Sequence, residues 1–119
     1  MSTKEIAQRL AELCSRGKWE EAQKELFAED AVSIEPHSSP AFEKETKGLK
    51  AIIEKGRKFE TMLEELHGIE VGEPVIAGNA IAFKLVMDVT MKGRPRENWE
   101  EICVYQVKDG KIISEQFCL

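Results

Sequence analysis

Residues 99–119 read WEEICVYQVKDGKIISEQFCL, two runs rich in Val, Ile and aromatic residues that flank Asp109-Gly110. Asp-Gly between two such runs is a strong β-hairpin signal, because Gly110 accepts the positive φ that a tight primed turn needs. A two-residue loop also sets the register of the two strands. The sequence therefore predicts a terminal hairpin in which Lys108 lies opposite Lys111.

Alternation of side chains away from this turn divides the hairpin into two faces. One face is expected to carry Trp99, Glu101, Cys103, Tyr105, Val107, Ile112, Ser114, Gln116 and Cys118. The other is expected to carry Ile102, Val104, Gln106, Ile113, Glu115 and Phe117. Neither face is purely polar, so both are expected to be covered. The first would line a helix-covered interior, and the second would contact a partner.

Composition limits the class of protein. The chain has 119 residues, enough for one domain over residues 1–119, and its 22 acidic and 17 basic residues give a net charge of -5. Without a basic stripe, nucleic acid is not expected as a partner. Three cysteines without CxxC spacing predict neither a disulfide framework nor a metal site. With no signal-peptide core or membrane-spanning stretch, we expect a cytoplasmic protein that does not bind membranes.

The rest of the chain predicts helices followed by strands. Apolar spacing predicts helices from a Ser2-x-x-Glu5 capping box to Gly17, over residues 19–26, and from Leu49 to about Leu63. Strands are expected at 31–36, 69–77 and 79–91, with a loop over 36–47. Helices followed by an antiparallel meander indicate an α+β domain.

This order of elements, with the motifs FAEDAVSIEP at Phe27–Pro36 and VYQVKDGKIISEQF at Val104–Phe117, resembles the nuclear transport factor 2-like superfamily. Within it, the chain is similar to the SnoaL-like polyketide cyclases and ketosteroid isomerase. The resemblance covers nearly the whole chain. It implies a cone-shaped, cystatin-like fold in which about three helices pack on a strongly curved, mostly antiparallel sheet around an apolar small-molecule pocket.

The resemblance also implies site residues. The isomerases place their general base just before a proline at the end of the first strand, which is Glu35 here. Their oxyanion donors, a tyrosine in the first helix and an acid in the penultimate strand, correspond to Leu10 and Cys103. Neither is a strong donor, and losing one donor typically costs on the order of a hundredfold in rate. The resemblance therefore implies a retained base without steroid-type isomerisation.

Each candidate has a functional and a structural interpretation. Glu35 is a general base, or a carboxylate at the rim of the pocket that pairs with a nearby lysine or caps a turn before Pro36. Glu101 is a second pocket carboxylate, or a strand-end residue that pairs with Arg94 or Arg96. His37 is a weaker acid-base candidate in a loop, and His67 is expected to be structural. Ligand contacts are expected from Leu10, Leu85, Met87, Trp99, Cys103, Tyr105, Ser114, Gln116 and Cys118. In the alternative interpretation, the aromatic and thiol side chains among them are simply core residues.

Two functions remain open from the sequence. The first is a cofactor-independent cyclase, isomerase or dehydratase in which Glu35 moves a proton on a small apolar carbonyl compound. The second is a module that binds a small apolar molecule without chemistry, or a dimeric accessory module. In either case an outer apolar face with Ile102, Val104, Ile113 and Phe117 predicts a two-fold symmetric homodimer.

Overall fold

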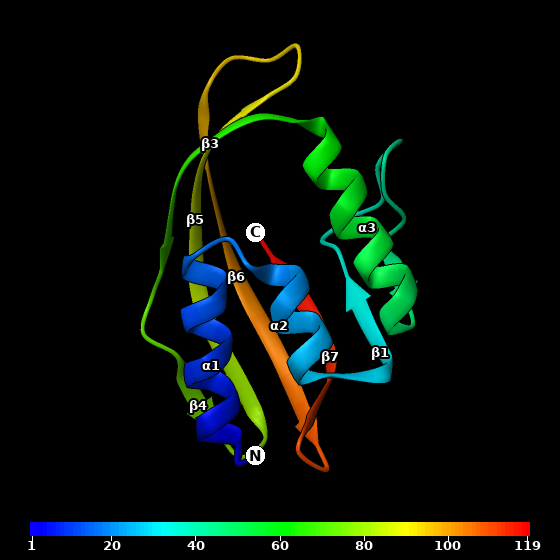
Figure 1. The fold of residues 1–119 in the computed structure, drawn as a ribbon, viewed down its shortest axis with the longest axis vertical. Coiled ribbons are helices and arrows are strands. Elements are labelled where there is room, and N and C mark those ends of the chain that lie inside the picture. The colour runs from blue at the N-terminus through cyan, green and yellow to red at the C-terminus, as the bar shows by residue number, and fades with distance from the viewer.

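Three helices pack against one side of a curved seven-stranded sheet that does not close into a barrel (Figure 1). The structure is a computed structural model that describes residues 1–119. The helices are α1 (Thr3–Ser15), α2 (Trp19–Leu26) and α3 (Leu49–Met62). The strands are β1 (Phe27–Ile34), β2 (Glu45–Lys47), β3 (Leu63–Val71), β4 (Val75–Ala77), β5 (Ala80–Met91), β6 (Glu97–Lys108) and β7 (Lys111–Cys118).

The sheet is antiparallel except at one pair of strands. Its order is β2-β1-β7-β6-β5-β3, with β4 also paired to β5, and β1 runs parallel to β7. The parallel pair brings the first strand next to the last, so the end of β1 lies beside the C-terminal half of β7. The predicted α+β fold class, helices on a curved and mostly antiparallel sheet, is confirmed.

The first helix begins and ends as the sequence predicts. Ser2 Oγ accepts a hydrogen bond from the Glu5 backbone N–H at 3.1 Å, and a Glu5 carboxylate oxygen accepts one from the Ser2 N–H at 2.9 Å. This reciprocal capping box satisfies two donors that a helix start leaves free. Past the helix end, Gly17 adopts φ +72°, which favours glycine.

The terminal hairpin forms with the predicted turn. Asp109 and Gly110 have φ values of 52° and 75°, and Lys108 pairs with Lys111. Next to β6, the inward residues of β5 are buried in strict alternation, namely Ile81, Phe83, Leu85, Met87, Val89 and Met91. The alternation in β5 therefore fixes which side of β6 faces the interior.

One part of the predicted hairpin register is wrong. A β-bulge shifts the pairing between Gln106 and Val107, so Tyr105 lies opposite Glu115 and Val104 lies opposite Gln116. A bulge inserts one unpaired residue, and a shift of one residue moves every following side chain to the opposite face. Ser114, Gln116 and Cys118 therefore share the outer face with Val104, whereas Glu115 and Phe117 share the inner face with Tyr105 and Cys103.

Three element boundaries also differ from the prediction. The first strand begins at Phe27, ahead of the expected start, and a short strand at Glu45–Lys47 forms inside the expected loop by pairing with β1. The third strand begins at Leu63, because Leu63 and Leu66 pair with β5 although their spacing also suits a helix. Pairing with a long neighbouring strand outweighs local helical periodicity here.

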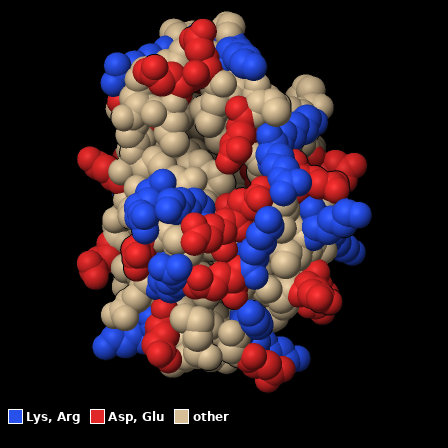
Figure 2. Space-filling view, in the orientation of Figure 1, with Lys and Arg blue, Asp and Glu red and all other residues tan.

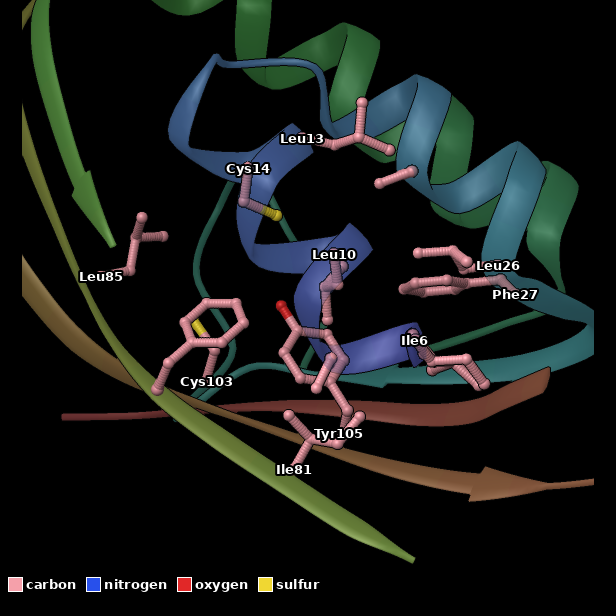
Figure 3. Close-up of a cluster of buried hydrophobic side chains, with 14 of the residues drawn as sticks. Ile6, Leu10, Leu13, Cys14, Leu26, Phe27, Ile81, Leu85, Cys103 and Tyr105 are labelled. Carbon is pink, nitrogen blue, oxygen red and sulfur yellow. The ribbon is translucent and has the colours of Figure 1, made fainter. Parts of the chain in front are cut away.

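The interior is packed between the sheet and the helices. Leu10 of α1 lies above the ring of Tyr105 of β6, with Ile81 of β5 beside that ring, whereas Leu13 points toward α2 (Figure 3). The Tyr105 ring meets Phe83 at 5.5 Å between centroids and Phe27 at 6.5 Å. The interior between α1 and the sheet is therefore filled by side chains.

The surface in view carries both signs of charge. Figure 2 shows Lys and Arg interspersed with Asp and Glu rather than gathered into a basic field. Several of these charges pair across helices, as in Arg9 with Glu25 at 2.7 Å and Arg57 with Glu20 at 2.8 Å. None of the helices has the length and apolar character that a membrane span requires.

Candidate functional site

A lysine and a carboxylate meet at the end of β1. Lys55 Nζ, on α3, donates to Glu35 Oε2 at 2.9 Å and to Ser33 Oγ at 2.6 Å. The side chains of Lys55 and Glu35 are 15% and 25% exposed, and Ser33 is fully buried. The lysine partner expected in the structural interpretation of Glu35 is therefore present, and the ion pair lies largely out of solvent.

Local structure places these three residues together. Ser33 and Glu35 alternate onto the same side of the chain at the end of β1, because they are two residues apart. Lys55 lies three residues after the buried Ile52 and four before the partly buried Phe59, so it shares the inward stripe of α3. An ammonium group thus stands at a position where helical spacing would otherwise place an apolar residue.

Glu115 is a second carboxyl group in this cluster. It lies opposite Ser33 across the β1–β7 pair and is only 4% exposed. Burial raises the pKa of Glu115, while a hydrogen bond from Ser33 and the charge of Lys55 partly offset that rise. The sequence analysis placed Glu115 on the outer face, and the bulge in β7 is why it faces inward.

Glu101 is the third carboxyl group. It lies on the inward side of β6 opposite Leu85, and burial together with the charges of Glu35 and Glu115 raises its pKa to about 7, Lys55 acting in the opposite sense. Its one short side-chain contact is with Cys103 Sγ at 4.0 Å. Arg94 instead pairs with Glu97 and Arg96 with Asp88, so the predicted alternative of an arginine partner for Glu101 is wrong.

Aromatic side chains border the same inward surface. Phe59 of α3 and Trp99 of β6 pack with centroids 6.0 Å apart, and Lys55 Nζ lies 5.6 Å from the centre of the Phe117 ring. All three rings are only partly buried, unlike Tyr105 and its neighbours at the other end of the interior. Together, Ser33, Glu35, Lys55, Glu101 and Glu115 form an acid-base cluster. This cluster therefore lies at the more accessible end of the helix-covered side of the sheet.

The remaining predicted residues divide into three groups. Leu10, Leu85, Met87, Cys103 and Tyr105 are buried in the core cluster, and Trp99 packs against it. His37 is exposed in the loop after β1, and no side-chain contact joins it to the cluster. Ser114, Gln116 and Cys118 lie on the outer face, so the prediction that they share the Tyr105 face is wrong.

Two surface hollows lie away from the cluster. One of about 270 Å³ runs between α1 and the segment that joins β3 to β4, where Ala11 and Pro74 contribute to its wall. Another of about 520 Å³ lies beside α2 and α3, lined by residues such as Lys24 and Ile53. Neither includes Glu35, Lys55 or Glu101.

Buried thiols and the tyrosine differ chemically from the cluster. Burial raises the pKa of Cys14 to about 12, and it raises the pKa values of Cys103 and Tyr105 well above their ordinary values. All three groups are therefore protonated at neutral pH. They contribute packing and weak hydrogen-bond donors rather than nucleophiles.

Sequence reasoning missed Lys55, Ser33 and Glu115. Lys55 had a usable signal, since a lysine on the apolar stripe of a helix needs a buried partner. Ser33 also had one, because it alternates with Glu35 on the same strand. Glu115 had none, because the bulge that turns it inward leaves no mark in the alternation of β7.

Comparison with known proteins agrees with this architecture. A candidate SnoaL-like polyketide cyclase, also described as a carbohydrate phosphatase, from Mesorhizobium loti is 31% identical, with a TM-score of 0.92 and full coverage of both chains. IdmH, a candidate polyketide cyclase from Streptomyces antibioticus, is 19% identical with a TM-score of 0.73, covering 98% of this chain and 91% of that one.

A protein of unknown function with a cystatin-like fold from Xanthomonas campestris is 17% identical with a TM-score of 0.76, covering 99% of this chain and 90% of that one. At these lower identities the likeness shows the fold alone. No curated protein sequence matches the chain. The sequence model of the SnoaL-like domain family matches residues 1–119, and the chain therefore belongs to the SnoaL-like domain family.

Proposed function

We propose that this protein catalyses proton transfer on a small apolar carbonyl compound, without a cofactor, as a SnoaL-like cyclase, isomerase or dehydratase. The observation that carries this proposal is that Glu101, whose pKa is raised to about 7 by burial and by the charges of Glu35 and Glu115, lies on the inward side of β6, two strands from β1 and the Lys55–Glu35 ion pair. Two carboxyl groups in different environments can take the roles of acid and base in proton transfer near neutral pH.

The two carboxyl groups take different roles. Glu35 is the general base, because Lys55 fixes its Oε2 atom by a hydrogen bond while its Oε1 atom stays available to a substrate. It removes a proton from the carbon next to a carbonyl group. Glu101 in its protonated form donates to the carbonyl oxygen as negative charge develops there. The proposed base, Glu35, thus lies at the position where the isomerases carry theirs. The proposed acid, Glu101, lies two residues before Cys103, which occupies the position of their acidic oxyanion donor.

The lysine adds electrostatic support. An ammonium group has three donors, and Lys55 uses two of them on Glu35 and Ser33. Its positive charge offsets part of the repulsion among Glu35, Glu101 and Glu115, which would otherwise favour protonation of more than one of them. Phe59, Trp99 and Phe117 give a planar apolar substrate rings to pack against.

Proton transfer can be tested without knowing the natural substrate. Enolisable 1,3-dicarbonyl compounds in D2O exchange their acidic C–H for deuterium, and NMR follows the rate. We expect the protein to accelerate this exchange and Glu35→Gln to lower the acceleration on the order of a hundredfold. Glu45→Gln, at an exposed residue of β2, is the matched control and keeps the full rate. Equal rates for the wild type and Glu35→Gln would contradict the mechanism.

A non-catalytic module is the second candidate. Leu10 and Cys103, both buried, favour this candidate. Neither side chain supplies a strong hydrogen-bond donor at the positions where the isomerases carry their oxyanion donors. In this alternative the same aromatic rings bind a small apolar molecule that is released unchanged. Binding of such a molecule with no deuterium exchange in any variant would support it over the enzyme. In both cases we propose a homodimer in the cytoplasm, which the three free thiols support.

A further inference from the structure

Three polar side chains form a connected relay on the outer face of the sheet. Glu65 Oε2 lies 2.5 Å from His67 Nδ1, and His67 Nε2 lies 2.8 Å from Thr90 Oγ1. Nδ1–H donation to the carboxylate leaves Nε2 as the acceptor for the Thr90 hydroxyl proton. A hydroxyl, an imidazole and a carboxylate are thus joined in the order that activates a hydroxyl as a nucleophile.

The pairing of β3 with β5 brings the three relay residues together. Glu65 lies opposite Thr90 in the antiparallel pair of β3 and β5, and His67 falls at a register shift between Leu66 and Gly68. A bulge re-aims the side chain at the shifted position. Although it belongs to the edge strand of the sheet, the His67 side chain is only 18% exposed, whereas that of Glu65 is 65% exposed. The imidazole is therefore held in place between an exposed carboxylate and the partly buried Thr90 hydroxyl.

This relay is separate from the proposed acid-base cluster. Thr90 alternates with the buried Val89 and Met91, so it lies on the opposite side of the sheet from Glu101 and Lys55. It also lies six residues along β5 from Lys84, which pairs with Ile102, or about 20 Å at roughly 3.4 Å per residue. The relay is thus remote from the apolar part of the outer face as well.

A cationic group lies beside the relay. Arg96 donates from Nε and Nη2 to the Asp88 carboxylate at 2.9 and 2.7 Å. The hydrogen bonds to Asp88 raise the pKa of Arg96, and the charge of Glu65 adds a smaller contribution. Arg96 therefore lies near enough to Glu65 for their charges to interact, while its Nε and Nη2 donors stay on Asp88.

We propose that Thr90 is an acyl acceptor at a second reactive site, in which His67 and Glu65 activate its hydroxyl toward small activated esters. As Thr90 Oγ1 bonds to the ester carbonyl carbon, its proton passes to His67 Nε2. The carbon–oxygen bond to the leaving alcohol or phenol then breaks, and His67 returns the proton to that oxygen. Water later attacks the acyl-threonine by the same route, releasing the carboxylic acid and restoring Thr90.

The test uses p-nitrophenyl acetate and the full chain. Release of p-nitrophenolate gives the reaction rate, and peptide mapping by mass spectrometry locates the transferred acetyl group, which separates Thr90 from reactive lysines. We expect acetyl on Thr90 in the wild type. His67→Gln should lower its rate of formation on the order of a hundredfold, as loss of a general base does. Glu65→Gln should give a smaller decrease, because it alters only the orientation of the imidazole.

Three further variants serve as controls for labelling at Thr90. Thr90→Val preserves the β-branched shape and removes the nucleophile, so it abolishes labelling at this position without a change in circular dichroism. Thr61→Val and His37→Gln alter an exposed threonine and an exposed histidine elsewhere and should leave labelling of Thr90 unchanged. Absence of acetyl on Thr90 in the wild type, or an equal rate in His67→Gln, would overturn the proposal. Neither result bears on the exchange reaction assigned to Glu35.

Discussion

The Lys55 ammonium nitrogen lies 2.9 Å from Glu35 Oε2, which joins α3 to the end of β1 inside the fold. The two residues are separated by 20 positions in sequence, and the side chains of both are largely buried. The pair therefore fixes the position of the proposed base and sets the charge balance of the cluster.

Removing this lysine should destabilise the protein. Lys55→Met keeps the length of the side chain but leaves the Glu35 side chain without its partner, near Glu101 and Glu115. We expect the free energy of unfolding to fall by about 2–3 kcal/mol at pH 7.5, below the value for a fully buried pair because both groups keep some solvent contact. Urea denaturation measures it. The double variant Lys55→Met with Glu35→Gln should recover part of the loss, and a purely additive double variant would show that the pair does not interact.

Glu101 should make stability depend on pH. Its pKa is raised from 4.5 to about 7 in the folded protein, so the folded state holds a proton that the unfolded state releases between these values. Stability is therefore lost as pH rises through this window, by up to about 3 kcal/mol. Glu101→Gln mimics the neutral acid and should become progressively more stable than the wild type from pH 5 to pH 8. A constant difference over that range, measured by denaturation, would rule out the raised pKa.

The cysteines report the register of β7. Cys118 lies on the outer face and is partly exposed, whereas Cys14 and Cys103 are buried. We expect a thiol reagent such as dithiobis(nitrobenzoic acid) to react rapidly with one thiol per chain in the native state and with three after unfolding. Cys118→Ser should remove the rapid reaction. If a native-state thiol still reacts rapidly in that variant, the face assigned to β7 is wrong.

The outer face should mediate self-association. Ile102 is 43% exposed on the outer side of β6, next to Val104, although Phe117, which the sequence placed there, faces inward. We expect a dimer by light scattering at micromolar concentration, and Ile102→Lys should give a monomer because it places a charge in the apolar contact. Ile76→Lys is the control, since Ile76 is 40% exposed but lies on the edge strand β4. A monomeric wild type would exclude the dimer.

Local signals in the sequence predict much of the fold. The Asp109-Gly110 turn, the Ser2–Glu5 capping box and the alternation in β5 each depend on residues close together in the chain, and all three are confirmed. The register of β7 could not be predicted in the same way. A turn fixes pairing only up to the first irregularity, and the bulge beside Val107 reverses every side chain beyond it.

The candidate site was only partly predictable for a related reason. Glu35 and Glu101 follow from a resemblance and from alternation, but their partners come from distant parts of the chain. Lys55 meets Ser33 across 22 positions, and the Glu115 carboxyl reaches the cluster only because of the bulge. Tertiary packing decides such contacts, so no local pattern reveals them.

The proposed mechanism requires that Glu101 is an acid with a near-neutral pKa close to Glu35. The most direct test is an NMR titration of the side-chain carboxyl carbons of the glutamates, with the Glu101 signal assigned by its loss in Glu101→Gln. The account predicts that this signal titrates with a midpoint of about pH 7. It also predicts that the midpoint falls in Glu35→Gln, because a neighbouring negative charge is removed. A Glu101 midpoint near 4.5, the ordinary value for a glutamate, that does not change in Glu35→Gln would contradict it.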